Sequence, residues 1–253
     1  MDGNESLNSS DMEGDAEGEL SSKGLAAQRV RQYLSEDENV RATDEMVERY
    51  IRAVGGRDAR KAAKRLKLTL EWYQHENIDS LMCPACPNVK SSHYMHCVCF
   101  DRFDRPTIYS CLELATNKDI EDNRKHMVAT FETAVLLMGE NVSQWNWILD
   151  FHGFGIRDCD PRLAKIFLNL AAEHYPERLG HFFVVDAPTL FSSLFKTIRP
   201  LIDPKTAKKI LFLKLKDEAA IHKHMGKYYE ADVLDWLVAE MRDNRCEMIV
   251  CLN

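Results

Sequence analysis

The chain has 253 residues, 45% of them hydrophobic, which is ample for a folded core, and no run approaches the 18 consecutive apolar residues of a membrane-spanning helix. Seven of its 40 acidic residues precede Lys23, where no Lys or Arg occurs; this end carries the net charge of −7, because the other 33 acidic residues balance 33 basic ones. The neutral remainder excludes a broadly basic nucleic-acid-binding surface, and the absence of a signal-peptide pattern, together with eight cysteines, favours a cytoplasmic chain with reduced thiols.

The first part of the chain is predicted to be an acidic tail followed by helices. Residues 1–23 are rich in Gly, Ser, Asn and acidic residues and have little to bury, so we expect a disordered tail. Residues 24–80 are predicted to form a helical module. In "TDEMVERYIRAVGG", Thr43 is placed as an N-cap and the glycine pair as the stop. In "DARKAAKRLKLTLEWYQHE", Asp58 is placed as an N-cap and apolar residues recur at helical spacing after it.

Residues 81–253 begin with the proline-bearing break "CPACPNVKSS" and then alternate between strand-like and helix-like segments. "YMHCVCF" and "TIYSCLEL" flank a short turn and predict two adjacent strands, whereas "WNWILDF", "HFFVVDAP" and "KKILFL" predict short buried strands. The helical patterns are "RKHMVATFETAVLLMGE", "DPRLAKIFLNLAAEHY", "TLFSSLFKTIRPLI" and a C-terminal "KYYEADVLDWLVAEMRDNR". This alternation predicts an α/β fold with a mainly parallel sheet flanked by helices.

Signatures of an enzyme are missing from this pattern. The segment "HGFGIRD" follows a predicted strand, but Asp158 stands where a dinucleotide-binding loop has its third glycine. Neither a nucleophile elbow nor a phosphate-binding Gly-Lys-Ser/Thr loop occurs. We therefore expect no catalytic residues and no organic cofactor.

A cluster of cysteines and histidines has the spacing of a metal site. Cys83 and Cys86 are separated as in a zinc knuckle, and His93 and His96, or Cys97, are candidates for the remaining ligands of a structural zinc ion. Two alternatives stay open: a thiol redox pair, and ordinary cysteines of a loop and a core strand.

One predicted helix is strongly amphipathic and carries basic residues. Its apolar face is formed by Phe191, Leu194, Phe195, Ile198, Leu201 and Ile202. The basic residues Lys196, Arg199, Lys205, Lys208 and Lys209 lie within or after it. The pattern fits a surface helix packed on the sheet, or a movable lid over an apolar cavity whose basic flank meets anionic lipid headgroups.

The succession "DRFDRPTIY", "WILDFHGFG" and "HYPERLGHFFVVDAPTLFSSLFKTIRPLIDPKTAKKILFL" closely resembles the CRAL-TRIO lipid-binding domain of phosphatidylinositol transfer proteins and related carriers. The helical segments before it resemble the N-terminal module that accompanies this domain. The resemblance covers about residues 25 to 215. It implies an apolar pocket gated by residues 189–202, non-covalent transfer or presentation of one lipid, and transient contact with an anionic membrane surface. A protein partner is not identified.

This resemblance also assigns roles to individual residues. It implies that Glu177 and Lys209 serve a phosphatidylinositol headgroup, although a structural ion pair between them is the alternative. The gate and pocket are expected to include Phe191, Leu194, Phe195, Ile198, Ile202, Trp145 and Trp147. Trp145 and Trp147 stand where the founding transfer protein has phosphatidylcholine-contacting Ser and Thr, so they change the pocket shape. Arg178 is expected to make only a surface contact.

Phosphatidylinositol is therefore the expected ligand of a cytoplasmic, peripherally membrane-associated protein. Two other functions stay open at this point. The chain is alternatively a carrier of another small hydrophobic ligand, or a non-transferring interaction protein whose pocket is filled by Trp145 and Trp147.

Overall fold

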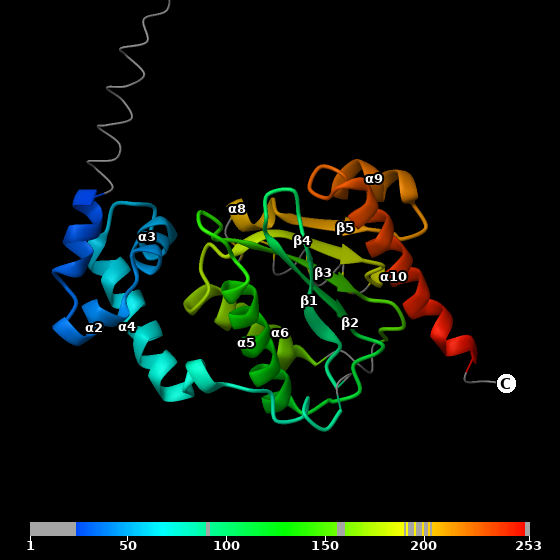
Figure 1. The fold of residues 1–253 in the computed structure, drawn as a ribbon, viewed down its shortest axis with the longest axis horizontal. Helices are drawn as coiled ribbons and strands as arrows, with labels where there is room; N and C mark the ends of the chain where they lie inside the picture. The colour runs from blue at the N-terminus through cyan, green and yellow to red at the C-terminus, as the bar shows by residue number, and fades with distance from the viewer. Residues whose placement is uncertain are drawn as a thin grey trace, which may run out of the picture. The chain divides into compact units, whose positions relative to one another are not determined.

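The computed structural model describes residues 24–89, 92–155, 160–189, 191, 195, 199, 202 and 204–250, and side chains as far as 245. The chain divides between Ile78 and Asp79 into two compact units, drawn in Figure 1. The predicted acidic tail, residues 1–23, lies outside the described residues.

The N-terminal unit is built from short capped helices. After a helical stretch at residues 24–31 come α2 (Glu36–Arg41), α3 (Asp44–Ala53) and α4 (Ala59–Glu76), followed by the 3-10 turn η1 (Ile78–Ser80) at the boundary. The Thr43 side chain accepts a hydrogen bond from the Met46 amide and the Asp58 side chain from the Lys61 amide, which confirms both predicted N-caps. The core of this unit includes Val30, Val47, Tyr50, Ala62, Ala63, Leu66 and Leu70.

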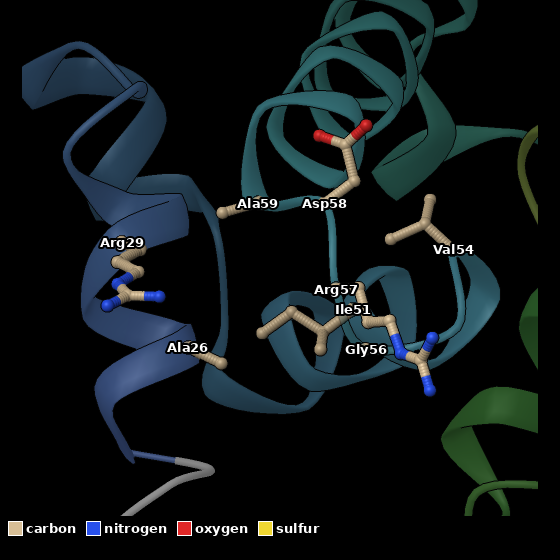
Figure 2. A pocket seen from close by; sticks show the side chains of 8 residues that line it. All are labelled: Ala26, Arg29, Ile51, Val54, Gly56, Arg57, Asp58 and Ala59. Carbon is tan, nitrogen blue, oxygen red and sulfur yellow. The ribbon is translucent and has the colours of Figure 1, made fainter.

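A small pocket of this unit lies beside the glycine pair that follows α3. Figure 2 shows its lining, which includes Ile51, Val54, Arg57 and Asp58. Its cavity volume is about 30 Å³, room for about one water molecule. This pocket is therefore too small for a lipid chain.

The second unit is organised around a five-stranded sheet in the order β1–β2–β3–β4–β5. The strands are β1 (Met95–Phe100), β2 (Pro106–Cys111), β3 (Trp145–Asp150), β4 (Leu179–Val185) and β5 (Ile210–Leu213). The first two pair antiparallel and the other neighbours pair parallel. The helices described in this unit include α5 (Ile120–Leu136), α6 (Pro161–Glu173), α8 (Pro204–Ala207), α9 (Glu218–Met225) and α10 (Ala231–Val250). The α/β fold with a mainly parallel sheet flanked by helices is confirmed.

Alternation along the strands gives this sheet two different apolar faces. Ile148 and Phe183 pair in register and pack with α9 and α10, through Ile221, Met225, Leu234, Leu237, Val238 and Met241. Trp147 and Phe182 also pair in register but point to the opposite face, since each is one residue removed along its strand. Figure 1 shows α9 and α10 on one side of the sheet and α5 and α6 on the other.

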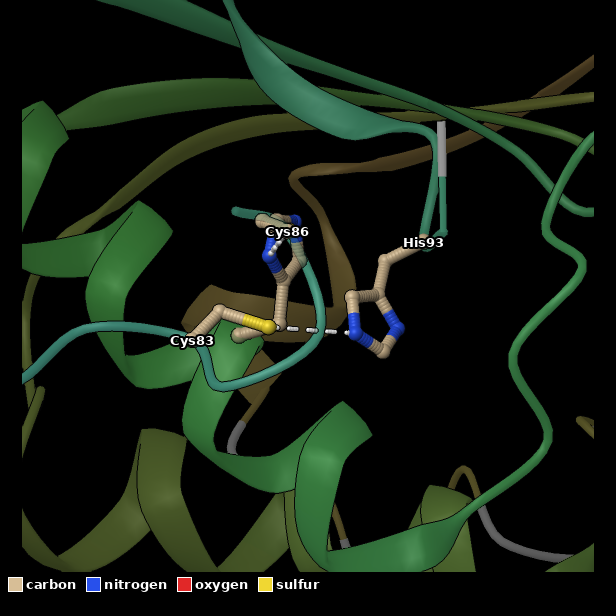
Figure 3. A group of neighbouring side chains, drawn as sticks. Cys83, Cys86 and His93 are labelled. Atoms are coloured by element: carbon tan, nitrogen blue, oxygen red, sulfur yellow. Dashed lines mark hydrogen bonds between the residues drawn. The ribbon is translucent and has the colours of Figure 1, made fainter. Parts of the chain in front are cut away.

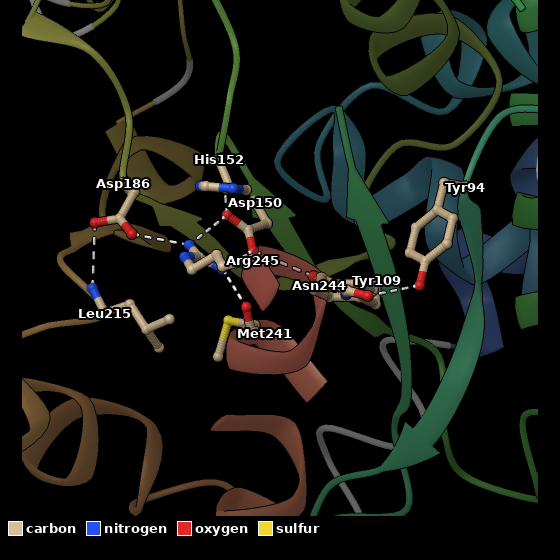
Figure 4. A network of polar contacts seen from close by, with 9 residues as sticks. All are labelled: Tyr94, Tyr109, Asp150, His152, Asp186, Leu215, Met241, Asn244 and Arg245. Atoms are coloured by element: carbon tan, nitrogen blue, oxygen red, sulfur yellow. Dashed lines mark hydrogen bonds and ion pairs between the residues drawn. The ribbon is translucent and has the colours of Figure 1, made fainter. Parts of the chain in front are cut away.

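The C-terminal helix is fixed to the carboxyl ends of two central strands by a charged network (Figure 4). Arg245 of α10 donates to both oxygens of the fully buried Asp150 at 2.8 and 2.9 Å, and to Asp186 after β4 at 2.8 Å. Asp150 also accepts from the Tyr109 hydroxyl at 3.2 Å, and that hydroxyl accepts from Asn244 at 2.9 Å. Since buried charges need partners, this network determines how α10 packs on the sheet.

Candidate functional site

The face of the sheet opposite α10 is lined by aromatic side chains. Trp145 and Trp147 of β3, both predicted pocket residues, are buried, with 4% and 5% of their surface exposed. Trp145 stacks on Phe131 of α5 with ring centroids 4.9 Å apart, and Trp147 meets Phe167 of α6 edge-on at 4.9 Å. The Trp147 Nε1 donates to the Ser110 hydroxyl at 2.8 Å. Both indoles are thus packed against other aromatic rings, the Trp147 N–H has a protein acceptor, and the face they form is apolar.

Two of the predicted gate residues lie against this face near the edge strand β5. The Phe191 ring lies 4.5 Å from Phe151, and the Phe195 ring lies 5.0 Å from Phe212 of β5. Ile202 is half-buried, whereas the predicted gate residues Leu194 and Ile198 lie outside the described residues. The described part of segment 189–202 therefore covers aromatic surface at one edge of the sheet.

The "HYPERLG" turn between α6 and β4 presents one charged side chain and buries the other. Glu177 has a left-handed backbone, with φ of 62°, and its side chain is exposed. Among the described residues, its carboxylate has no recorded partner, and only its backbone carbonyl accepts, from the Gln144 amide at 3.2 Å. Arg178 is 5% exposed and donates to the Ser143 carbonyl at 3.1 Å. The prediction of a surface contact for Arg178 is wrong, because its guanidinium joins this turn to the loop before β3.

Lys209 lies beside the same turn. Its ammonium donates to the Leu179 carbonyl at 2.6 Å, two residues after Glu177. Burial lowers the pKa of the neighbouring His181 to about 4, helped by the charges of Arg105 and Lys209 and opposed by Asp101. Arg105 and Lys209 thus bring positive charge close to His181 at this end of β4 and β5.

Three of the four predicted metal-binding residues come together, with a different fourth. Cys83, Cys86 and His93 lie close to one another in the segment before β1 (Figure 3), and the fourth neighbour is His126 of α5. His96 lies elsewhere, with its ring edge-on to Tyr94 at 5.3 Å. No spacing pattern points to His126, because it follows Cys86 by forty positions and lies in an ordinary helical pattern.

Comparison with known proteins identifies the family. A family model described as the CRAL/TRIO domain matches residues 92–232, which is more than half of the chain. The chain belongs to the CRAL/TRIO domain family. The matched residues include all five strands and helices α5, α6, α8 and α9, and they end just after the start of α10, so the CRAL/TRIO unit is the one that holds the aromatic face and the "HYPERLG" turn.

Relatives of this CRAL/TRIO chain include fungal proteins. It is 28% identical over 204 residues to a CRAL-TRIO domain-containing protein of Schizosaccharomyces pombe, covering 80% of this chain and 19% of that one. It is 33% identical over 95 residues to the SEC14 cytosolic factor of Kluyveromyces lactis (37% and 28% covered). It is 28% identical over 117 residues to the phosphatidylinositol transfer protein CSR1 of Eremothecium gossypii (46% and 27% covered). The chain thus spans less than a third of the length of each of these curated relatives.

A solved structure shares the fold. The crystal structure of Sfh5 superposes with a TM-score of 0.57 at 16% identity, covering 72% of this chain and 68% of that one. Within the described part of this CRAL/TRIO chain, none of the helices combines the length and the apolar character needed to cross a membrane.

Proposed function

We propose that this protein binds a single lipid molecule in an apolar pocket between the aromatic face of the sheet and segment 189–202, and that it transfers or presents the lipid between membranes. The observation that carries this proposal is the contact of Phe191 and Phe195 with Phe151 and Phe212. A segment that covers aromatic surface at a sheet edge would expose that surface when it moves. Membership of the CRAL/TRIO family supports the same function.

The energetics of such a pocket need no covalent chemistry. Each methylene moved from water into an apolar environment contributes about 0.8 kcal/mol, so ten buried methylenes supply about 8 kcal/mol. Much of this gain is also available in the bilayer that the lipid leaves, so lipid can be exchanged in both directions. In this proposal the chain is a carrier and not an enzyme.

Phosphatidylinositol is the lipid that we propose. Glu177 presents an exposed carboxylate, which can accept hydrogen bonds from inositol hydroxyls, and Lys209 brings an ammonium to the same turn, where it can offset the phosphate charge. Buried Arg178 fixes this turn to the loop before β3 through its hydrogen bond to the Ser143 carbonyl. The name of one relative, phosphatidylinositol transfer protein CSR1, supports the same ligand class.

The membrane that the protein visits is proposed to be anionic and to face the cytoplasm. Arg199, Lys205 and Lys208 are exposed and follow or lie within the gate segment. Basic side chains beside an apolar segment favour attachment to anionic lipid surfaces, each by about 1 kcal/mol near the surface. The name of another relative, the SEC14 cytosolic factor, supports a cytoplasmic location.

Transfer of fluorescent phosphatidylinositol between vesicles tests the headgroup assignment. Lys209→Ala removes the ammonium beside Leu179, and Lys208→Ala is the matched control, because Lys208 is its exposed neighbour. Loss of a hydrogen bond to a charged group costs about 1.5–3 kcal/mol, so the transfer rate should fall about tenfold or more in Lys209→Ala alone. Equal rates in the two variants would contradict the assignment.

The packing of Trp145 and Trp147 favours a second candidate, an interaction protein that does not transfer lipid. Both indoles are already buried against Phe131 and Phe167. If these rings fill the pocket, the wild-type protein moves no phosphatidylinositol and no labelled neutral lipid in the same assay. A protein that moves only the neutral lipid is a carrier of another hydrophobic ligand.

A further inference from the structure

Four potential metal ligands converge where the segment before β1 meets α5. The sulfur atoms of Cys83 and Cys86 and one ring nitrogen each of His93 and His126 all lie within 4.8 Å of one another. Cys83 and His93 are buried, and the other two are half-buried. We propose that these four side chains bind one zinc ion.

The distances are close to those of a zinc tetrahedron. With zinc–sulfur bonds of about 2.3 Å and zinc–nitrogen bonds of about 2.0 Å, the ligand atoms of a tetrahedral site lie about 3.3–3.8 Å apart. Cys83 Sγ lies 3.2 Å from His93 Nε2, and Cys86 Sγ lies 3.2 Å from His126 Nδ1. Figure 3 shows the first of these contacts. The widest pair has to close by only about 1 Å for a metal to bind.

The contact of His93 with Asn123 leaves the correct ring nitrogen available to a metal. The amide nitrogen of Asn123 donates to the carbonyls of Asn117 at 3.0 Å and Asp119 at 2.6 Å, so its Oδ1 faces His93 as an acceptor. Nδ1 of His93 lies 3.3 Å from this oxygen and therefore carries the proton. Nε2, which faces Cys83, is then the unprotonated nitrogen that a metal needs.

His126 is oriented in the same way, but here Nε2 donates to the protein and Nδ1 faces the cysteine. Its Nε2 lies 2.7 Å from the Met95 carbonyl, which can only accept, so Nε2 carries the proton. Its Nδ1 therefore presents a lone pair toward Cys86. A metal-ligating histidine almost always donates its other N–H to a carbonyl or carboxylate, and both histidines here do so to an oxygen of the protein.

The charge of the site also suits a divalent cation. Two thiolates balance Zn²⁺, and two neutral imidazoles add no charge, so the bound group is neutral. Without a metal, these four polar atoms offer one another only weak thiol–imidazole contacts. The Cys-x₂-Cys spacing, the two oxygens that face the outer nitrogens of the histidines, and the four converging atoms are independent features that agree on the same ligand.

Zinc at this position would tie the segment before β1 to α5 within the second unit. His126 lies five residues before Phe131 on α5, and Phe131 stacks on Trp145 of the aromatic face. A metal would thus fix the helix that supports the pocket wall. Zinc binding is nevertheless measurable without any lipid, so failure of either proposal leaves the other intact.

Metal content of the full chain tests the proposal directly. Protein purified under reducing conditions, without a polyhistidine tag, should contain about one zinc ion per chain when measured by inductively coupled plasma mass spectrometry. Cys86→Ser and His126→Ala should lower this content at least tenfold. His96→Ala and Cys97→Ser are the matched controls on the neighbouring strand and should keep the metal.

Cobalt binding to the wild-type protein provides a test that needs no variant. Co²⁺ added to the reduced, metal-free chain should give the intense visible bands of a tetrahedral site with thiolate-to-cobalt charge transfer, and Zn²⁺ should abolish them. The proposal is overturned if the reduced chain takes up neither Zn²⁺ nor Co²⁺. It is equally overturned if Cys83 and Cys86 are recovered as a disulfide, or if His96→Ala loses the metal while His126→Ala keeps it.

Discussion

Replacing Arg245 by Met tests how the C-terminal helix is held on the sheet. The substitution removes two hydrogen bonds to the fully buried Asp150 and one to Asp186. Breaking a buried ion pair from one side costs about 3–5 kcal/mol, because the remaining charge is left uncompensated. We expect the lower end, about 3 kcal/mol, because 18% of the Arg245 side chain is exposed. Urea unfolding followed by circular dichroism measures the loss.

Arg242→Met is the matched control for this prediction. Arg242 lies on the same helix but forms an exposed pair with Glu218, and such pairs contribute about 0–1 kcal/mol. The double variant Asp150→Asn with Arg245→Met should lose less than the sum of its single variants, since it strands no charge at Asp150. If Arg245→Met unfolds within about 1 kcal/mol of the wild type, or no more easily than Arg242→Met, the buried network does not hold the helix.

Three further predictions concern the aromatic face and the "HYPERLG" turn. Phe131→Ala should lower the free energy of unfolding by about 3–5 kcal/mol in the same urea assay, because Phe131 is buried against Trp145; a loss below about 1 kcal/mol would refute that packing. His181 has a pKa of about 4 when folded and about 6.5 when unfolded, so the unfolded chain binds more protons between these values and the wild type should lose stability as pH falls from about 6.5 to 4. His181→Phe should weaken this dependence without removing it, because burial also lowers the pKa of His126 to about 4, and an unchanged pH profile would contradict the assignment. Glu177→Gly relieves a left-handed backbone and should raise stability by up to about 1 kcal/mol while lowering phosphatidylinositol transfer; a loss of stability would instead favour a structural role for Glu177.

The elements of the fold were predictable because their signals are local. Caps at Thr43 and Asp58 accept from amides three residues away, and the apolar runs of the strands are bounded by turn residues. The sheet followed from the alternation of strands and helices, and the family from the motifs around the "HYPERLG" turn. The caps, the apolar runs and the motifs each depend on neighbouring residues, and the alternation follows from reading these local signals in chain order.

The site residues that sequence reasoning missed depend on contacts between distant segments. His126 takes the place expected for His96 because α5 carries it to Cys86, forty positions away. A charged residue in a turn is usually exposed, yet Arg178 is buried because its guanidinium reaches the Ser143 carbonyl. Arg245 meets Asp150 across ninety-five positions. Only the packed structure brings these groups together.

Native mass spectrometry of the purified full chain, followed by extraction and identification of lipids, tests the proposed function most directly. We expect one phospholipid per chain, with phosphatidylinositol as the main species, and a wild-type protein that moves labelled phosphatidylinositol between vesicles. A chain that is recovered empty, and that moves neither labelled phosphatidylinositol nor a labelled neutral lipid, would contradict the proposal that the aromatic face and segment 189–202 enclose a lipid.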